Sequence, residues 1–133
     1  MEPRGAVATS GAYSVRLTVP PYPWEYVEKD DKHAEATYAP IRGEVGNLWS
    51  GDFIGYQIRR DEEAGLVMAS PEGIVGLAYA QGPALEPLGR QTIEYAKTLR
   101  IPGLQYRTDG AEVVAEDARR IAIAGFELPA GLQ

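Results

Sequence analysis

The sequence predicts a mainly β protein, folded as a small barrel or sandwich of about eight short strands with at most one or two short helices. Short apolar segments recur at fairly even spacing, and several alternate apolar with polar residues as half-buried strands do. Many of the 15 glycines and 10 prolines fall at the joints between these segments, where turns need them. The even spacing and the turn residues together favour a β fold.

The length of the chain, 133 residues, is that of a single domain. Residues 1–11 are small and polar with no periodicity, so we expect a flexible N-terminal arm that orders only against something else. Residues 12–133 then form one β-rich domain. Because the arm adds nothing to the core, the domain buries less surface than the full length suggests, and association becomes an expected source of stability.

Residues 13–19 give the clearest strand. The odd-numbered residues from Tyr13 to Val19 are apolar or aromatic and the residues between them are polar, so one face would be buried and the other solvated. The prolines at 20 and 21 end this strand, because they lack the amide donors that pairing requires.

Three aromatic residues are interleaved with prolines in the segment PPYPWEYV at 20–27. If exposed, Tyr22, Trp24 and Tyr26 would form a platform for a sugar, a peptide or another subunit. If buried, they would belong to a loop folded over the core, because exposed aromatic clusters are unusual in monomers. Both interpretations stay open. The candidate interface or binding residues are these three together with Tyr13 and Trp49.

The middle of the chain predicts a meander of three short strands. Segments at 53–59, 66–69 and 74–80 have strand character and are separated by turns at 61–65 and 70–73. We expect the acidic residues in the first of these turns to be solvated, because neighbouring side chains on an extended segment point apart and do not converge on one metal ion.

After a proline-rich crossing at 82–89, the segment at 92–101 fits either a strand or, more weakly, a helix, and we favour the strand. Asp109-Gly110 then predicts a two-residue hairpin turn between strands at 104–108 and 111–114, because type I′ turns need positive φ at both central residues.

The chain is expected to end in a single helical turn at 116–120 and a last strand at 121–128. A further short strand is expected earlier, at 35–38, after the charged turn that precedes His33.

No constellation of residues predicts catalysis. The chain has one histidine, His33, which lies between Lys32 and Ala34 as surface residues usually do, and none of its serines sits at the strand-to-helix elbow of a nucleophilic hydrolase. The closely spaced glycines between 43 and 55 lack the Lys-Ser or Lys-Thr of a phosphate loop. We therefore predict no catalytic residues, no metal ligands and no cofactor.

The charge and the missing residue types exclude several classes. A net charge of −6 argues against nucleic acid as a partner, because phosphate binding needs a basic surface. The absence of cysteine excludes disulfides and thiolate zinc sites. No apolar run approaches the roughly eighteen residues of a membrane span, and no signal-peptide core follows Met1, so we expect a soluble, unexported protein. The single Asn, two Met and ten prolines fit either a thermostable protein or a GC-rich genome.

The segment at 48–80, LWSGDFIGYQIRRDEEAGLVMASPEGIVGLAYA, resembles the pattern of the small head-decoration proteins of tailed bacteriophages. The features shared are a Gly-Asp entry turn at Gly51-Asp52, two short strands, and a Gly-Ile-x-Gly strand that begins at Gly73. The arm before the first strand and the short last strand also fit that family, whereas the segment at 20–27 has no clear counterpart in it. The resemblance covers about half of the chain.

The resemblance implies a β-rich homotrimer that sits on a capsid lattice in the virion and contacts the major capsid protein. Its N-terminal arm would add to a strand of the shell protein, which is the kind of contact that an unstructured arm can form at an exposed sheet edge. Without the resemblance, the expected location is the cytoplasm.

Three functions follow from these observations. We favour a non-enzymatic assembly protein that decorates and stabilises a viral shell, without contact to nucleic acid or membrane. The alternative is a β-rich module that binds carbohydrate or peptide through the aromatic segment at 20–27. The third is a small β-barrel enzyme, which would need a pocket with converging carboxylates.

Overall fold

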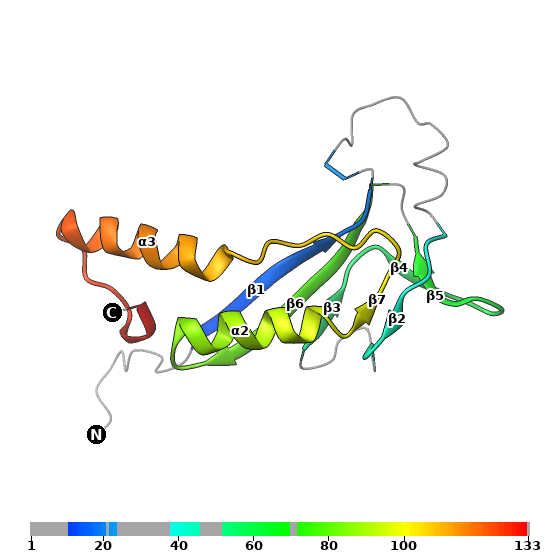
Figure 1. Ribbon diagram of the computed structural model, residues 1–133, viewed down its shortest axis with the longest axis horizontal. Helices are drawn as coiled ribbons and strands as arrows, with labels where there is room; N and C mark the ends of the chain where they lie inside the picture. The colour runs from blue at the N-terminus through cyan, green and yellow to red at the C-terminus, as the bar shows by residue number, and fades with distance from the viewer. Residues whose placement is uncertain (1–10, 21, 24–37, 46–51, 70–71, 133) are drawn as a thin grey trace, which may run out of the picture.

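The computed structural model describes residues 11–20, 22–23, 38–45, 52–69 and 72–132 (Figure 1). The expected arm at 1–10 lies outside the described residues, and so does all of the strand expected at 35–38 except its last residue, Tyr38. Gly11, which we assigned to the arm, is the first residue of a strand.

The largest sheet has three antiparallel strands in the order β1-β6-β3. Strand β1 (Gly11–Thr18) confirms the clearest sequence prediction, and its partner β6 (Ile74–Gly82) runs beside it along its whole length. Strand β3 (Phe53–Gly55) pairs with the other edge of β6. Strand β1 is therefore an edge strand of this sheet, and β6 lies at its centre.

A bulge interrupts the pairing of β1 and β6 between Leu17 and Thr18. It lies beside Gly76, whose φ is +154° and whose added Cβ would be 2.1 Å from the carbonyl oxygen of Ile54. Only glycine allows the backbone of β3 to come this close to β6.

The single strand expected at 53–59 is wrong, because this segment is divided between β3 and β4 (Ile58–Asp61), which belong to different sheets. Strand β4 forms a hairpin with β5 (Gly65–Met68) through the expected turn, with Asp61 opposite Gly65. The expected meander is nevertheless wrong in its pairing, because β5 does not pair with β6, whose two edges are taken by β1 and β3. Strand character in a sequence does not say which strands are neighbours. Strand β1, which comes first in the chain, pairs with β6 along its whole length and occupies one of its edges. Two further short strands, β2 (Arg42–Gly43) and β7 (Leu99–Arg100), pair with each other.

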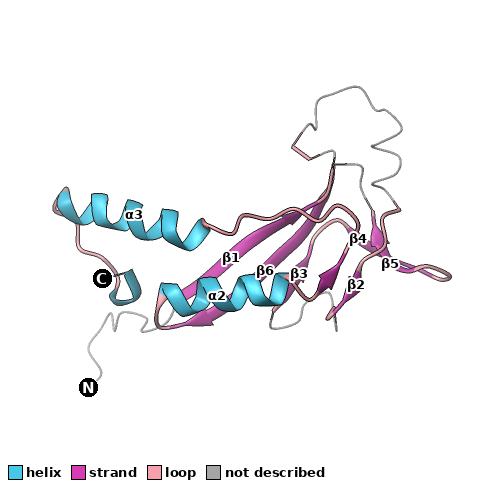
Figure 2. Cartoon of the chain, viewed as in Figure 1, coloured by secondary structure: helices cyan, strands magenta, loops and turns pink. Residues whose placement is uncertain are grey.

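The strand favoured at 92–101 is wrong over most of its length, because helix α2 covers Leu85–Ala96 and only β7 remains as strand. The proline-rich crossing at 82–89 is likewise wrong beyond Ala84. Pro87 lies in the first turn, where its missing N–H costs no hydrogen bond. Small residues hid the helical period, since the buried face of α2 consists of Leu88, Gly89, Thr92 and Ala96. This face packs on β1 and β6 (Figure 2).

The hairpin predicted at Asp109-Gly110 is also wrong, because helix α3 spans Gly110–Ile123. Asp109 has φ −103° instead of the positive φ of a type I′ turn, and its position is that of a helix N-cap. The strand at 111–114 and the isolated helical turn at 116–120 are both parts of this one helix.

The last strand, predicted at 121–128, is wrong as well. Residues up to Ile123 belong to α3, and Gly125 ends the helix with φ +93°. The amide of Gly125 donates to Ala122 and that of Phe126 donates to Ile121, which is the hydrogen-bond pattern of a Schellman motif. The chain then turns back to a short 3-10 helix, η1 (Ala130–Leu132).

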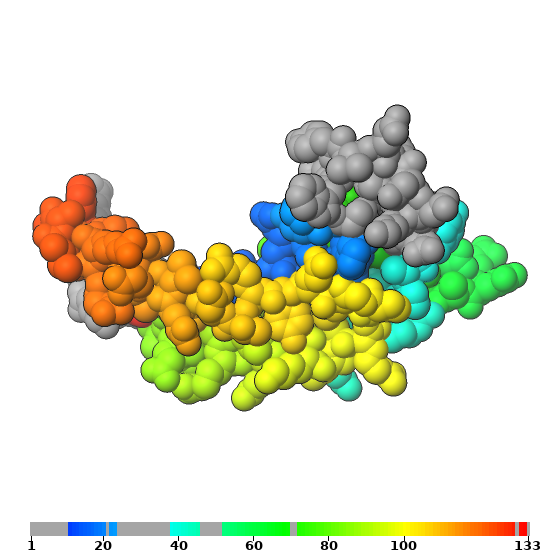
Figure 3. Space-filling model, turned by 45° about the horizontal axis from the view of Figure 1, so that its top comes forward, coloured from blue at the N-terminus to red at the C-terminus, as the bar shows by residue number. Residues whose placement is uncertain are grey.

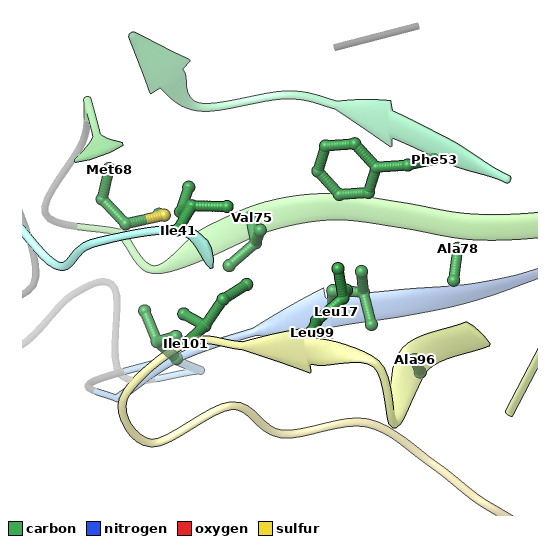
Figure 4. Packing of buried hydrophobic residues seen from close by; sticks show 10 residues of the cluster. Leu17, Ile41, Phe53, Met68, Val75, Ala78, Ala96, Leu99 and Ile101 are labelled. Atoms are coloured by element: carbon green, nitrogen blue, oxygen red, sulfur yellow. The ribbon is translucent and has the colours of Figure 1, made fainter. Parts of the chain in front are cut away.

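The hydrophobic core lies where the sheets, the end of α2 and β7 meet (Figure 4). Leu17 of β1, Phe53 of β3 and Met68 of β5 are fully buried in it. The core cluster consists of Leu17, Val19, Ile41, Phe53, Met68, Val75, Ala78, Ala96, Leu99 and Ile101. The core is thus shared among elements between β1 and β7, and no residue of α3 belongs to the cluster.

The prediction of a strand-rich protein is confirmed. The described strands form three small sheets and do not close into a barrel, and a sandwich is not confirmed either. The helices α2 and α3 have 12 and 14 residues, so they are longer than the short helices that the sequence predicted.

Candidate functional site

A groove of about 630 Å³ runs along the outer edge of β1. We call it the β1 groove. One wall comes from the even-numbered residues of β1, and the other comes from residues 105–107, between β7 and α3. Its lining includes Ser14, Arg16, Tyr22, Gln105, Tyr106 and Arg107.

The polar character of the β1 groove follows from the alternation along β1. Val15 and Leu17 point into the core, so Ser14 and Arg16 point to the opposite face of the sheet. On that face Arg16 lies opposite Leu77 of β6, which lines the floor of the groove. The pattern that buries one side of β1 therefore exposes a row of polar side chains on the other.

Arg16 is held by a tyrosine. Its Nη1 donates a hydrogen bond of 2.7 Å to the hydroxyl of Tyr22, and the guanidinium lies 6.0 Å from the centre of the Tyr22 ring. The partner is a hydroxyl group and not a carboxylate, so this contact orients the guanidinium without forming an ion pair. No carboxylate in the described part of the chain pairs with Arg16.

Arg107, at the other side of the groove, is neutralised. Its Nε and Nη2 each donate to the carboxylate of Asp109 at 2.9 Å, in the two-pronged geometry that suits guanidinium and carboxylate. The hydrogen bond from Arg107 lowers the pKa of Asp109, and the same pair raises the pKa of Arg107. Arg16 is therefore the groove's unneutralised cation among the described residues.

The backbone of β1 is unpaired along part of this groove. Thr18 donates to Gln105 O at 3.0 Å and accepts from Gln105 N at 2.7 Å, so the backbone groups of Thr18 point away from β6. Because these groups alternate along a strand, those of Ala12, Ser14 and Arg16 point the same way. They have no backbone partner in the described ranges.

A second surface lies on α3, at one end of the molecule (Figure 3). Of the 14 residues of this helix, only Ala118 is buried. Val114 and Ile121 share its side of the helix but are 38% and 47% exposed, and Phe126 just beyond the helix is 68% exposed. We call these exposed apolar residues the α3 surface: Val113, Val114, Ile121, Ile123 and Phe126.

An apolar cavity of about 450 Å³ lies between α3, the start of α2 and the ends of β1 and β6. Tyr13, Leu88, Val114 and Leu132 are among the residues that line it. Burial, followed by the charge of Asp109, raises the pKa of Tyr13.

The structure separates the site residues that the sequence predicted. Tyr22 lines the β1 groove, and Tyr13 lines the apolar cavity. Trp24, Tyr26 and Trp49 lie outside the described residues. The sequence reasoning missed Arg16, because it treated the scattered basic residues as solvated. It missed the α3 surface, because it assigned strands there.

The described residues hold no group of three His, Cys, Asp or Glu side chains placed to bind a metal ion. None of their helices is long and apolar enough to span a membrane. The β1 groove presents charge, aromatic rings and backbone groups that no described residue pairs with, and α3 presents apolar area.

The chain matches no protein-family model, and no curated protein matches it significantly.

Proposed function

We propose that this protein is a non-enzymatic assembly protein that associates with itself and stabilises a larger protein shell, as capsid decoration proteins do. The observation that carries the proposal is the α3 surface, which leaves Val114, Ile121 and Phe126 exposed on a helix that has one buried residue. A second copy of the chain would cover these side chains.

The energetics of α3 support association. A helix of this length is marginal in water without tertiary packing, because helix nucleation is costly. The ion pairs of Glu116 with Arg119 and Arg120 add little, since both arginine side chains are largely exposed and that of Glu116 is about half exposed. Burial of the apolar side chains against another copy would contribute about 25 cal/mol for each Å² removed from water.

The resemblance of residues 48–80 to phage head-decoration proteins supplies the finer parts of the proposal: a trimer, the major capsid protein as partner, and the virion as location. These parts rest on sequence pattern. The strand-rich core and the edge strand β1 are compatible with them.

Light scattering on the purified protein tests self-association. We expect an oligomer that dissociates when Val114 and Ile121 are both replaced by Ser. The matched control is Tyr56→Ser, which removes an aromatic residue that is 70% exposed on the loop between β3 and β4. A wild-type protein that stays monomeric at all concentrations would contradict the proposal.

Cosedimentation tests the shell partner. The capsid protein encoded nearest to this gene, assembled into shells, is expected to pull the wild-type protein into the pellet and to resist heat better in its presence. An oligomer that leaves such shells unbound would keep self-association and exclude the decoration role.

A β-rich ligand-binding module is the second candidate, and the pairing of Arg16 with Tyr22 in the β1 groove favours it. In that case Trp24→Ala is expected to abolish binding in a screen of glycans and peptides while the oligomeric state stays unchanged.

A further inference from the structure

We propose that the outer edge of β1 binds an extended acidic segment of a partner protein. The segment adds to the three-stranded sheet beside β1, and one of its carboxylates contacts Arg16. This inference rests on the β1 groove alone, so it does not depend on association through α3.

The free backbone groups of β1 call for an extended peptide. Ala12, Ser14 and Arg16 each direct one N–H and one C=O away from β6, and none of these groups has a partner in the part of the chain that the structure describes. A strand laid along this edge would satisfy them in pairs, as in β-strand addition. Water or a small ligand would satisfy them without selecting any sequence.

Thr18 is the next residue along β1 whose backbone groups point away from β6, and it shows that this edge can pair with an antiparallel neighbour. Thr18 already exchanges both backbone hydrogen bonds with Gln105, at 3.0 and 2.7 Å. The pairing stops there, because residues 106–108 form no described backbone hydrogen bond with β1. The β1 groove, with a volume of about 630 Å³, opens beside Ser14 and Arg16 and gives room for a short peptide. Ala12 lies beyond the groove and lines the apolar cavity next to α3.

Charge identifies the kind of segment. Arg16 is oriented by the hydroxyl of Tyr22 and has no carboxylate partner among the described residues, whereas Arg107 across the groove is already paired with Asp109. An acidic side chain opposite Arg16 would complete a charge-assisted hydrogen bond, and a basic one would be repelled. Tyr106 and Leu77 supply apolar contacts beside this position. We therefore commit to an acidic partner segment.

The probe is a short labelled peptide with blocked ends, in which Thr and Val alternate around one central Glu. Fluorescence anisotropy measures its binding to the full-length protein. We expect saturable binding, and roughly tenfold weaker binding when Lys replaces the Glu, as the loss of a charge-assisted hydrogen bond predicts. A fully N-methylated version keeps the side chains but has no amide donors, and its binding is expected to vanish.

Two substitutions in the protein test the roles of Arg16 and of the β1 backbone in binding the peptide. Arg16→Gln is expected to bring the binding of the Glu peptide down to that of the Lys peptide. Arg90→Gln makes the same change on α2 at a residue that does not line the β1 groove, so it is expected to leave the binding unchanged. Ser14→Pro removes one outward N–H without removing a β1–β6 hydrogen bond, so it is expected to block the edge. Circular dichroism reports whether Ser14→Pro still folds, and the methylated peptide tests strand addition without any substitution.

Equal binding of the N-methylated peptide would exclude strand addition, and equal binding of the Lys peptide would exclude the assignment to an acidic segment. If the Glu peptide does not bind, the proposal fails. If Ser14→Pro instead turns an oligomer into a monomer, the edge is occupied by a second copy and the assignment to a partner protein is wrong. If replacing Val114 and Ile121 by Ser leaves the oligomer unchanged, the proposed association through the α3 surface is wrong, and the proposal for the β1 groove is not affected.

Discussion

The hydroxyl of Tyr13 in β1 lies directly against the backbone of Gly110, the first residue of α3. A Cβ added at Gly110 would be 2.2 Å from that oxygen. The contact joins the start of the first strand to the start of the last long helix, and it lies beside the apolar cavity that Tyr13 lines. It fixes where α3 begins relative to the sheet.

Gly110→Ala is expected to destabilise the protein by about 1 kcal/mol, because the new Cβ would push the Tyr13 hydroxyl out of its present position. The sign of this change in stability is informative, because replacing Gly by Ala in an unobstructed helix would stabilise the protein by up to about 1 kcal/mol. Urea denaturation measures the difference. Gly11→Ala is the control, since an added Cβ at Gly11 meets no atom within 4 Å and should leave stability nearly unchanged.

Tyr13 is expected to ionise later than an ordinary tyrosine. Burial, with a smaller effect of Asp109, raises its pKa above the ordinary 10.0 in the folded state. The folded protein therefore holds the phenolic proton more tightly than the unfolded chain, so this contribution to stability is present below about pH 10 and is lost as the pH rises through the folded pKa.

The absorbance of tyrosinate checks this expectation. Subtracting the alkaline titration of the Tyr13→Phe variant from that of the wild type isolates Tyr13, and the midpoint should lie above about pH 10. A midpoint at or below that value would contradict the burial of the hydroxyl against Gly110.

The β4–β5 hairpin is expected to weaken in acid. Asp61 accepts hydrogen bonds from the amides of Ala64 and Glu63, at 2.9 and 3.0 Å, and pairs with Arg59 at 3.2 Å. The amide of Ala64 contributes most to lowering the pKa of Asp61. Because the folded pKa lies below the unfolded one, the stabilisation is present above about pH 4 and is lost as the pH falls through the folded pKa.

Asp61→Asn keeps the oxygen that accepts the two amides but removes the charge. Its melting temperature should therefore vary less than that of the wild type as the pH falls below about 4. Glu62→Gln, which neutralises the neighbouring carboxylate, is the control and should follow the wild-type curve. If the two variants behave alike, the acid sensitivity comes from elsewhere in the protein.

Gly125→Ala is expected to cost roughly 1–2 kcal/mol, because Gly125 ends α3 with φ +93° and residues with a Cβ avoid that region. Steric crowding plays no part, since the added Cβ meets nothing within 4 Å. Gly125→Asn should cost less, because Asn tolerates this conformation better. Thermal unfolding ranks the three proteins, and equal stability of all three would contradict the Schellman motif.

Two features in the first half of the chain could be predicted because their signals are local. Strict alternation defines β1, and an acidic turn followed by Gly65 defines the β4–β5 hairpin. Of the candidate site, the same alternation could have predicted that Ser14 and Arg16 share the polar face of β1. It could not have predicted that Tyr22 directs Arg16, because that contact depends on where the chain goes after Pro20.

The second half could not be predicted in the same way, since its helices bury small residues. The face of α2 that packs on the sheet includes Gly89, which touches Ala111 of α3 so closely that a Cβ would lie 2.6 Å from it. Such faces lack the large apolar side chains from which a helical period is recognised. The dipeptide Asp109-Gly110 is likewise compatible with either a hairpin turn or the start of a helix. The packing of Gly110 against Tyr13 favours the start of a helix.

The sequence by itself determined a strand-rich domain, the position of β1 and the polar row that β1 exposes, because the alternation of side chains along a strand is a property of the backbone. Only the tertiary structure decided that β6 lies between β1 and β3, that residues 85–96 and 110–123 are helices, and that no described residue pairs with the outer edge of β1 beside Arg16. The physical reason is that strand order and close helix contacts depend on which surfaces meet, and segments far apart in the chain determine those surfaces together.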